Sequence, residues 1–188
     1  MIYIVSGVSR SGKTKVAKEL LEQHKLPYLS TDAVMMAFMH GVKEVDLHDK
    51  MWPGELAEKL WGFLKHFIVT LIHSEKDYVL EGEAFLPNKI AELLLEYPKD
   101  IKVVFMGYDS IDITVKVNDC KNYSTSNHDW LLQEDDAFIE THVRNMVGYS
   151  KELKDLCKKY NLPYFDQKDD FLGNIKRVQD FLVNSRCR

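Results

Sequence analysis

The sequence is poor in arginine and cysteine, and its basic residues never cluster. Five of the 188 residues are arginine, no run of five basic residues occurs, and the formal net charge is −4. Proteins that bind nucleic acid usually present a clustered basic face, so this pattern argues against a nucleic-acid partner. The three cysteines are widely spaced and odd in number, which excludes a disulfide framework and is typical of reduced thiols.

A long hydrophobic run is also missing. The most apolar long segment, 56–72, is interrupted by Glu58, Lys59, Lys65 and His66. Because a membrane-spanning helix needs about 20 predominantly apolar residues, we predict no contact with a membrane. No basic leader precedes the first apolar run, so we expect a cytoplasmic protein. Hydrophobic residues make up 45% and charged residues 29%, which favours one globular domain over 1–188.

Short apolar runs alternate with longer helical patterns. The strand-like runs are 2–5, 27–30, 78–80, 101–106 and 162–165. The helical patterns are 13–24, 33–40, 54–73, 88–96, 134–160 and 171–183. This alternation is typical of βαβ units, so we predict a three-layer α/β/α fold with a five-stranded parallel sheet. Thr31 or Asp32 is expected to cap the helix 33–40, and the polar stretch 119–129 is expected to be a mobile loop.

One motif is specific. Residues 7–14 read Gly7-Val8-Ser9-Arg10-Ser11-Gly12-Lys13-Thr14, a complete G-x-x-x-x-G-K-[ST] phosphate loop between an apolar strand and an amphipathic helix. Its glycines let successive backbone N–H groups turn toward an anion, and the helix N-terminus adds positive charge. Lys13 is expected to reach the β- and γ-phosphates of ATP, and the Thr14 hydroxyl to bind Mg²⁺. The sequence therefore predicts binding of ATP with Mg²⁺.

With this loop and this order of elements, the chain resembles the small P-loop kinases, the group of shikimate kinase, gluconate kinase and adenylate kinase. The resemblance implies a P-loop NTPase fold of the nucleoside monophosphate kinase type. It further implies that helices over about 32–74 cover the phosphoryl acceptor and that a lid spans about 108–134. The expected activity is transfer of the γ-phosphoryl group of ATP to a hydroxyl of a small molecule.

Two acidic positions match that pattern. Asp32 corresponds in place to the aspartate that contacts the acceptor hydroxyl in shikimate kinase-like enzymes, where a carboxylate orients the alcohol and accepts its proton. It is equally well placed as a helix cap. Glu81 ends the third strand, where the resemblance implies a carboxylate that binds the magnesium water shell, and Glu83 is expected to contact the acceptor instead. The alternative for both glutamates is an exposed acidic turn.

The remaining expectations concern the lid and the adenine base of ATP. Residues 108–134 contain no arginine, so Arg144, on the long helix that follows, is the candidate for stabilising the transferring phosphoryl group. Its alternative is a surface pair with Glu140. Asp166-Gln167-Lys168 follows the last strand, where the resemblance implies that backbone faces adenine.

Other functions fit less well. A GTPase needs D-x-x-G after an early strand and N-K-x-D, but Asp170–Gly173 lies near the end of the chain and 88–91 lacks the aspartate. A nucleotide kinase, a toxin-like kinase of a sugar nucleotide and a non-catalytic ATP-binding or ATPase regulatory protein share the loop. No arginine lies between Asp32 and Asp100, so we predict an acceptor that is neutral or cationic rather than a nucleoside monophosphate.

Overall fold

Five parallel strands form one sheet in a computed structural model that describes residues 1–42, 44–48, 51–122 and 130–184. Their bounds are β1 Ile2–Gly7, β2 Tyr28–Ser30, β3 Tyr78–Gly82, β4 Ile101–Gly107 and β5 Tyr164–Asp166. The order across the sheet is β2-β3-β1-β4-β5, and all four pairings are parallel. The predicted five-stranded parallel sheet is thus confirmed.

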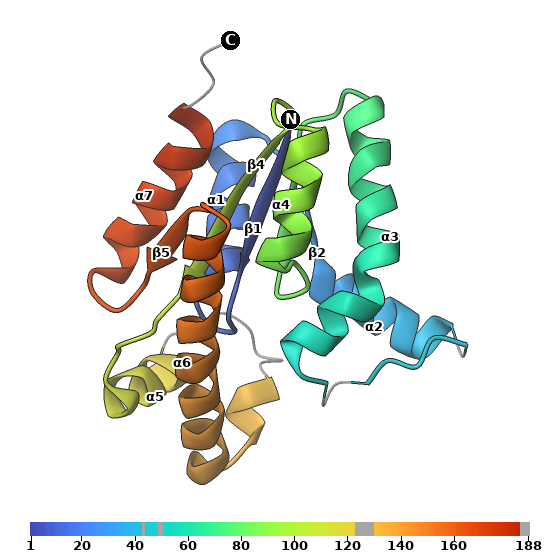
Figure 1. Cartoon of the computed structure of the whole chain (residues 1–188). Helices are drawn as coiled ribbons and strands as arrows, with labels where there is room; N and C mark the ends of the chain where they lie inside the picture. The colour runs from blue at the N-terminus through green and yellow to red at the C-terminus, as the bar shows by residue number, and fades with distance from the viewer. Residues whose placement is uncertain (43, 49–50, 123–129, 185–188) are drawn as a thin grey trace.

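The helices lie on both faces of this sheet (Figure 1). Their bounds are α1 Lys13–His24, α2 Thr31–Gly41, α3 Pro53–His73, α4 Pro87–Glu96, α5 Ile113–Asn122, α6 Asp136–Lys159 and α7 Phe171–Asn184, with a 3-10 helix at Trp130–Gln133. Successive β1 side chains enter different cores: Ile4 packs with α3, α4 and α6, whereas Val5 packs with α1 and α7. Since neighbouring strand residues point to opposite faces, the sheet is the middle of three layers.

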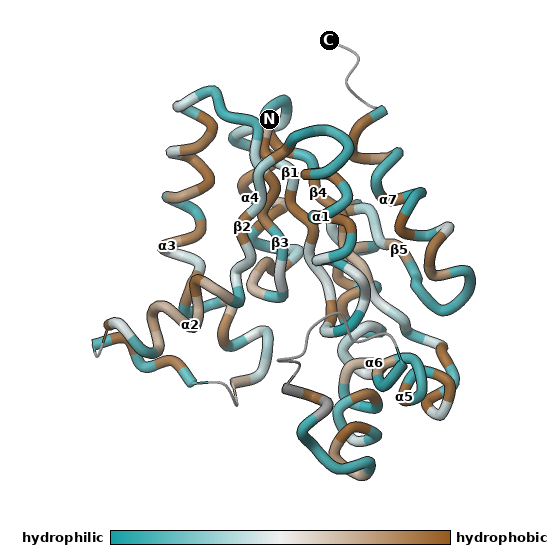
Figure 2. Tube along the Cα trace, turned by 180° about the vertical axis from the view of Figure 1, so that it is seen from behind, coloured by the Kyte–Doolittle hydropathy of each residue, from teal (hydrophilic) through white to brown (hydrophobic). Residues whose placement is uncertain are grey.

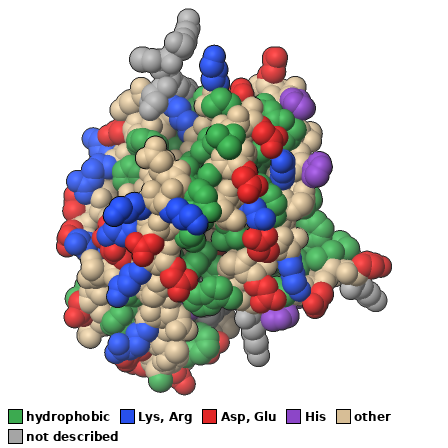
Figure 3. Space-filling view, viewed as in Figure 1, with side chains coloured by type: hydrophobic (Ala, Val, Ile, Leu, Met, Phe, Trp, Pro, Cys, Tyr) green, Lys and Arg blue, Asp and Glu red, His purple; other side chains and the backbone are tan. Residues whose placement is uncertain are grey.

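The central strands β1, β3 and β4 are largely buried on both faces and therefore lack polar alternation. Every β1 residue is buried, and Figure 2 shows hydrophobic colour along the centre of the sheet. On the face seen in Figure 3, lysine and arginine are interspersed with aspartate and glutamate. Within the described ranges, no helix is both long enough and apolar enough to cross a membrane.

One helix was not predicted. Residues 119–122 are the last turn of α5, so the expectation of a loop was wrong for them, while 123–129 lie outside the described residues. Val117 and Cys120 of α5 pack against Leu131, Ile139 and Val143. This contact with α6 stabilises a helix whose own composition is mostly polar, because tertiary packing outweighs local propensity.

The start of α2 also differs from the prediction. Ser30 is the N-cap residue, and its hydroxyl accepts a hydrogen bond from the Asp32 backbone N–H at 3.3 Å. The helix therefore begins at Thr31, and neither Thr31 nor Asp32 caps it. With the cap supplied by Ser30, the Asp32 carboxylate has no capping role.

Candidate functional site

The loop between β1 and α1 uses backbone that requires glycine at two positions. Gly7 has φ +138°, and a Cβ atom there would lie 1.9 Å from the Met106 carbonyl oxygen of β4. Gly12 precedes α1 with φ +95°, and its Cβ would lie 2.7 Å from Ile175 Cδ1 of α7. Left-handed backbone and close neighbours both exclude larger residues, so the two glycines of the motif are needed for the path of the loop itself.

Lys13 folds back across this loop. Its side-chain nitrogen donates to the Val8 carbonyl oxygen at 2.7 Å, and Ser11 Oγ donates to the same oxygen at 2.8 Å. Lys13 is only 6% exposed, and its Nζ lies 3.7 Å from Glu83 Oε1. An ammonium group is thus held next to the loop, with carboxylate beside it.

Thr14 faces Glu81 at the end of β3. The Thr14 hydroxyl oxygen lies 3.3 Å from both carboxylate oxygens of Glu81. Glu81 is 1% exposed, and its register partners are Val5 and Ser30 on the neighbouring strands. Burial raises the pKa of Glu81, while the Lys13 ammonium and the Ser30 hydroxyl act in the opposite direction. A hydroxyl and a carboxylate side by side are the hard oxygen ligands that Mg²⁺ prefers.

Glu83 and Asp32 complete a group of three carboxylates around Lys13. Burial raises the pKa of Glu83, and the Lys13 ammonium opposes that rise only in part. The Asp32 carboxylate is exposed on the first turn of α2 and lies close enough to raise the pKa of both glutamates. The structure thus brings together Lys13, Asp32, Glu81 and Glu83 from three elements at the carboxyl edge of the sheet, where open α/β folds bind ligands.

Solved structures that superpose on nearly the whole chain include kinases of small molecules. A gluconokinase from Sinorhizobium meliloti 1021 superposes with a TM-score of 0.57 and 16% identity over 97% of this chain and 91% of its own. A shikimate kinase from Bacteroides thetaiotaomicron gives 0.56 and 14%, covering 97% and 98% of the two chains. A sugar kinase from Janibacter sp. HTCC2649 gives 0.57 and 15%, covering 98% and 95%. No protein-family model matches the sequence, and no curated protein matches it.

The chain has the fold of the small P-loop kinases. In this kinase fold the loop 7–14 occupies the turn between the first strand and the first helix, as the motif predicted. The identities, 14% to 16%, establish the fold and leave the acceptor to be argued from the side chains.

Arg144 lies on the surface of this P-loop kinase fold. Its Nε and Nη2 atoms donate to Glu140 Oε1 at 3.0 and 2.6 Å, and its side chain is 62% exposed. This is the surface pair that the spacing allowed as the alternative. The pair lies one turn apart on α6, and the catalytic assignment of Arg144 stays a prediction.

Two residues outside the motifs donate hydrogen bonds to backbone carbonyls of the phosphate loop. The Tyr108 hydroxyl donates to the Ser9 carbonyl at 2.7 Å, and Lys116 Nζ donates to the Arg10 carbonyl at 2.9 Å. Tyr108 is fully buried, and Lys116 is 5% exposed. The one sequence signal for Lys116 was its position three residues after Ile113 and four before Cys120, on the apolar side of α5.

The segment after β5 is already bonded to its neighbours. The Gln167 N–H donates to the Gly107 carbonyl at 2.7 Å, and the Lys168 N–H donates to Asp166 Oδ1 at 3.1 Å. Burial and the neighbouring Asp109 carboxylate raise the pKa of Asp166 to about 6. These N–H groups are therefore committed within the protein, although the buried Gln167 side-chain amide has no hydrogen-bond partner among the described residues.

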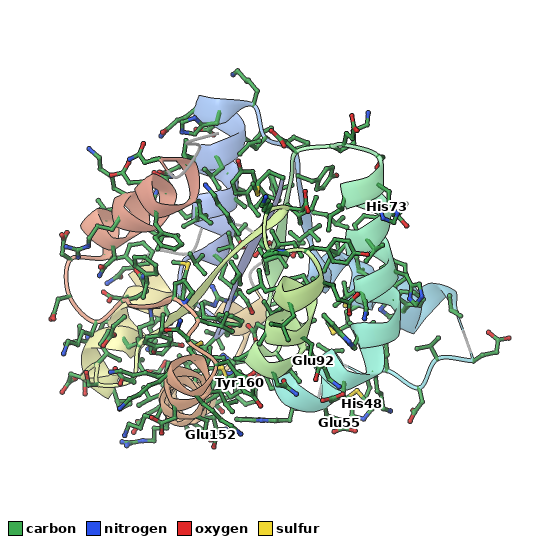
Figure 4. The ribbon with its side chains drawn as sticks, turned by 45° about the horizontal axis from the view of Figure 1, so that its top comes forward. His48, Glu55, His73, Glu92, Glu152 and Tyr160 are labelled. Atoms are coloured by element: carbon green, nitrogen blue, oxygen red, sulfur yellow. The ribbon has the colours of Figure 1, made fainter. Side chains whose placement is uncertain are left out.

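Two surface hollows lie apart from the four site residues. One, of about 320 Å³, lies between α1 and α7. The other, of about 340 Å³, lies between α4 and the end of α6, and Figure 4 labels Glu92 and Tyr160 from its lining. Neither is lined by Lys13, Asp32, Glu81 or Glu83.

Proposed function

We propose that this protein is an ATP-dependent kinase that transfers the γ-phosphoryl group of ATP to a hydroxyl of a small neutral or cationic molecule. The observation that carries the proposal is the convergence of Lys13, the Thr14–Glu81 pair, Glu83 and Asp32 beside one phosphate loop. Each has the charge or the donor that one part of phosphoryl transfer requires.

The nucleotide side of the site is assigned first. The N–H groups of 7–14 and the Lys13 ammonium bind the phosphates, and Lys13 exchanges its bond to the Val8 carbonyl for phosphate oxygens. The Thr14 hydroxyl and the Glu81 carboxylate hold Mg²⁺, directly or through its water shell. When bound, the ion would offset negative charge on the phosphates, and Glu81, in its ionised form, would hold it.

The acceptor side belongs to Asp32, with Glu83 as a second contact. Asp32 is exposed, stands at the start of α2 and has no capping role, so its carboxylate is available to orient a hydroxyl and accept its proton. The Glu83 side chain is 20% exposed, lies 3.7 Å from Lys13 Nζ and interacts with the charge of Asp32. Once phosphates occupy Lys13, the carboxylates lose their nearby counter-charge, which disfavours an anionic acceptor.

The described lysines between Asp32 and Asp100 support this charge preference. Lys59, Lys65 and Lys89 are in ion pairs with Asp46, Glu96 and Glu58, each at 3.0 Å. Lys76 and Lys99 lie in the turns that enter β3 and β4, at the opposite edge of the sheet. Lys43 and Lys50 lie outside the described residues. Each described lysine between Asp32 and Asp100 is therefore either in an ion pair or in a turn that enters a strand.

The segments around the acceptor are assigned by position. We propose that the helices over about 32–74, α2 and α3, cover the acceptor, and that about 108–134, which includes α5 and the 3-10 helix, acts as the lid. The Phe63 ring stacks on Phe67 and packs edge-to-face with Phe38, with 5.1 Å between the centroids of the Phe63 and Phe38 rings, so these aromatic side chains pack with one another. Trp52 is different: it is 43% exposed and contacts Tyr149 of α6 at 5.3 Å between ring centroids.

The test is acceptor-dependent ADP release from MgATP. The panel contains amino alcohols, sugars, antibiotics and nucleosides, with AMP, CMP, UMP and GMP as anionic comparisons. We expect turnover with a neutral or cationic alcohol and loss of that turnover in Asp32→Asn. Conversion of a monophosphate to its diphosphate would make this chain a nucleotide kinase, and failure to bind MgATP in calorimetry would overturn the proposal. Binding without ADP release for any acceptor would favour a regulatory ATP-binding protein.

A further inference from the structure

Two buried side chains hold consecutive carbonyl groups at the tip of the phosphate loop. Tyr108, the first residue after β4, donates its hydroxyl to the Ser9 carbonyl at 2.7 Å. Lys116 of α5 donates to the next carbonyl, that of Arg10, at 2.9 Å. The Lys116 nitrogen also lies 4.4 Å from the centre of the Tyr108 ring, a cation–π distance. The two donors thus contact the loop and each other.

These carbonyls belong to the part of the loop with the least ordinary backbone. Arg10 has φ +62°, a left-handed conformation that side-chain-bearing residues rarely adopt. A phosphate loop works by turning its N–H groups toward the anion, and the carbonyls on the other side of the peptide planes then need donors of their own. Tyr108 and Lys116 supply those donors at two successive peptide planes.

Burying the Lys116 ammonium group has a free-energy cost. Burial lowers the pKa of Lys116, because a charged ammonium group is disfavoured away from water. Its neighbours on α5, Val117 and Cys120, pack into an apolar cluster that a hydrophobic side chain at 116 would extend. Packing alone therefore favours an apolar residue here, while the loop carbonyl and the Tyr108 ring favour a cation.

We propose that Tyr108 and Lys116 are positioning residues that hold the tip of the phosphate loop in its phosphate-binding conformation before the nucleotide arrives. The expected consequence is tighter binding of nucleotide, and this consequence rests on the proposed function. The positioning role goes beyond that function by placing part of nucleotide affinity in β4 and α5, away from the loop motif. Because α5 lies within 108–134, the pair also connects this segment to the phosphate loop.

The test uses three variants of the full chain. Lys116→Met keeps the length and burial of the side chain without its charge, and Tyr108→Phe removes one hydroxyl. Lys121→Met is the matched control, since Lys121 lies on the same helix and pairs with the exposed Asp136. Hydrogen exchange of the backbone amides of 8–12 is measured without nucleotide, and affinity for MgATP and MgADP by calorimetry.

We expect about tenfold faster exchange of the loop amides in Lys116→Met and Tyr108→Phe, and about tenfold weaker binding of both nucleotides, as loss of one buried hydrogen bond implies. Lys121→Met should match the parent. Equal losses for ATP and ADP support positioning, whereas a loss confined to ATP would mean direct contact with the γ-phosphate and would overturn it. Unchanged exchange and affinity would also overturn it. If Lys116→Met does not fold, Tyr108→Phe tests the positioning role by itself. If the parent protein binds no ATP, the exchange rates of the loop amides still test it.

Discussion

Replacing Lys13 by methionine tests the nucleotide site most directly. Lys13 is 6% exposed, so methionine preserves most of the packing and removes the charge. The ammonium donates to the Val8 carbonyl at 2.7 Å and lies 3.7 Å from Glu83 Oε1. With nucleotide bound it would donate to phosphate oxygens instead, and two charge-assisted hydrogen bonds correspond to about 3 kcal/mol or more, which is about a hundredfold in Kd.

The effect is measurable as nucleotide-dependent stabilisation. ATP at 100 times its Kd stabilises a protein by about 2.7 kcal/mol, and a hundredfold weaker Kd reduces this to about 0.4 kcal/mol. For a chain of this size, these values correspond to increases in Tm of about 5 to 10 °C in the parent and about 1 °C in Lys13→Met. Differential scanning calorimetry with and without MgATP measures both. Lys15→Met is the control, because Lys15 is 41% exposed and pairs with Glu19 on the same helix.

The same variant should change the pH dependence of stability. Burial already raises the pKa of Glu81 and Glu83, and Lys13 opposes that rise. Without Lys13 both pKa values rise further. A carboxyl whose pKa is raised by folding contributes stability at low pH and loses it as pH increases through the folded pKa. Lys13→Met should therefore approach the parent's stability near pH 5 and fall below it toward pH 8. An unchanged ATP-dependent increase in Tm would refute the assignment of Lys13.

Three further predictions concern the other site residues. Ser30→Ala should lower Tm by about 2 to 4 °C through loss of the α2 cap, whereas Asp32→Asn should leave Tm nearly unchanged; equal decreases in calorimetry would contradict the assignment of the cap. Asp166→Asn should weaken the pH dependence of the free energy of unfolding between pH 5 and 7, measured by urea unfolding. The pKa of Asp166 is raised to about 6, so its ionisation beside Asp109 destabilises the fold as pH increases. The same pH dependence as in the parent would contradict this role of the Asp109–Asp166 pair. Arg144→Ala should change the free energy of unfolding by at most about 0.5 kcal/mol, because it removes one exposed helical pair; a tenfold loss of phosphoryl transfer would then give Arg144 a catalytic role.

Most of the sheet was predictable because its central strands are buried on both faces. The continuous apolar run Ile2–Val5 is the direct consequence of that burial, and the observed β1 is Ile2–Gly7. The weakest prediction among the strands was the last, where 162–165 was expected and Tyr164–Asp166 was found. Pro163 and the short length left little pattern to read. Helix α5 was missed because its stability comes from packing on α6.

The sequence by itself determined the phosphate loop and the kind of ligand that we expect it to bind. Gly7, Gly12, Lys13 and Thr14 lie within eight consecutive residues, so their spacing encodes both the backbone path and the charge presented to a phosphate. The three carboxylates were also recognisable as strand-end residues. Local order along the chain is enough for such features because parallel strands bring their carboxyl ends to one edge.

Only the tertiary structure decided which side chains act on one another. Ser30 rather than Asp32 caps α2, Glu81 of β3 faces Thr14 in the first turn of α1, and Arg144 pairs on the surface. Lys116 reaches a loop carbonyl 106 positions away in the chain. No spacing rule encodes the contacts of Glu81 and Lys116, because the packing of β3 against α1 and the docking of α5 set them. Their energies come from burial and partner geometry, which exist only once the layers have packed.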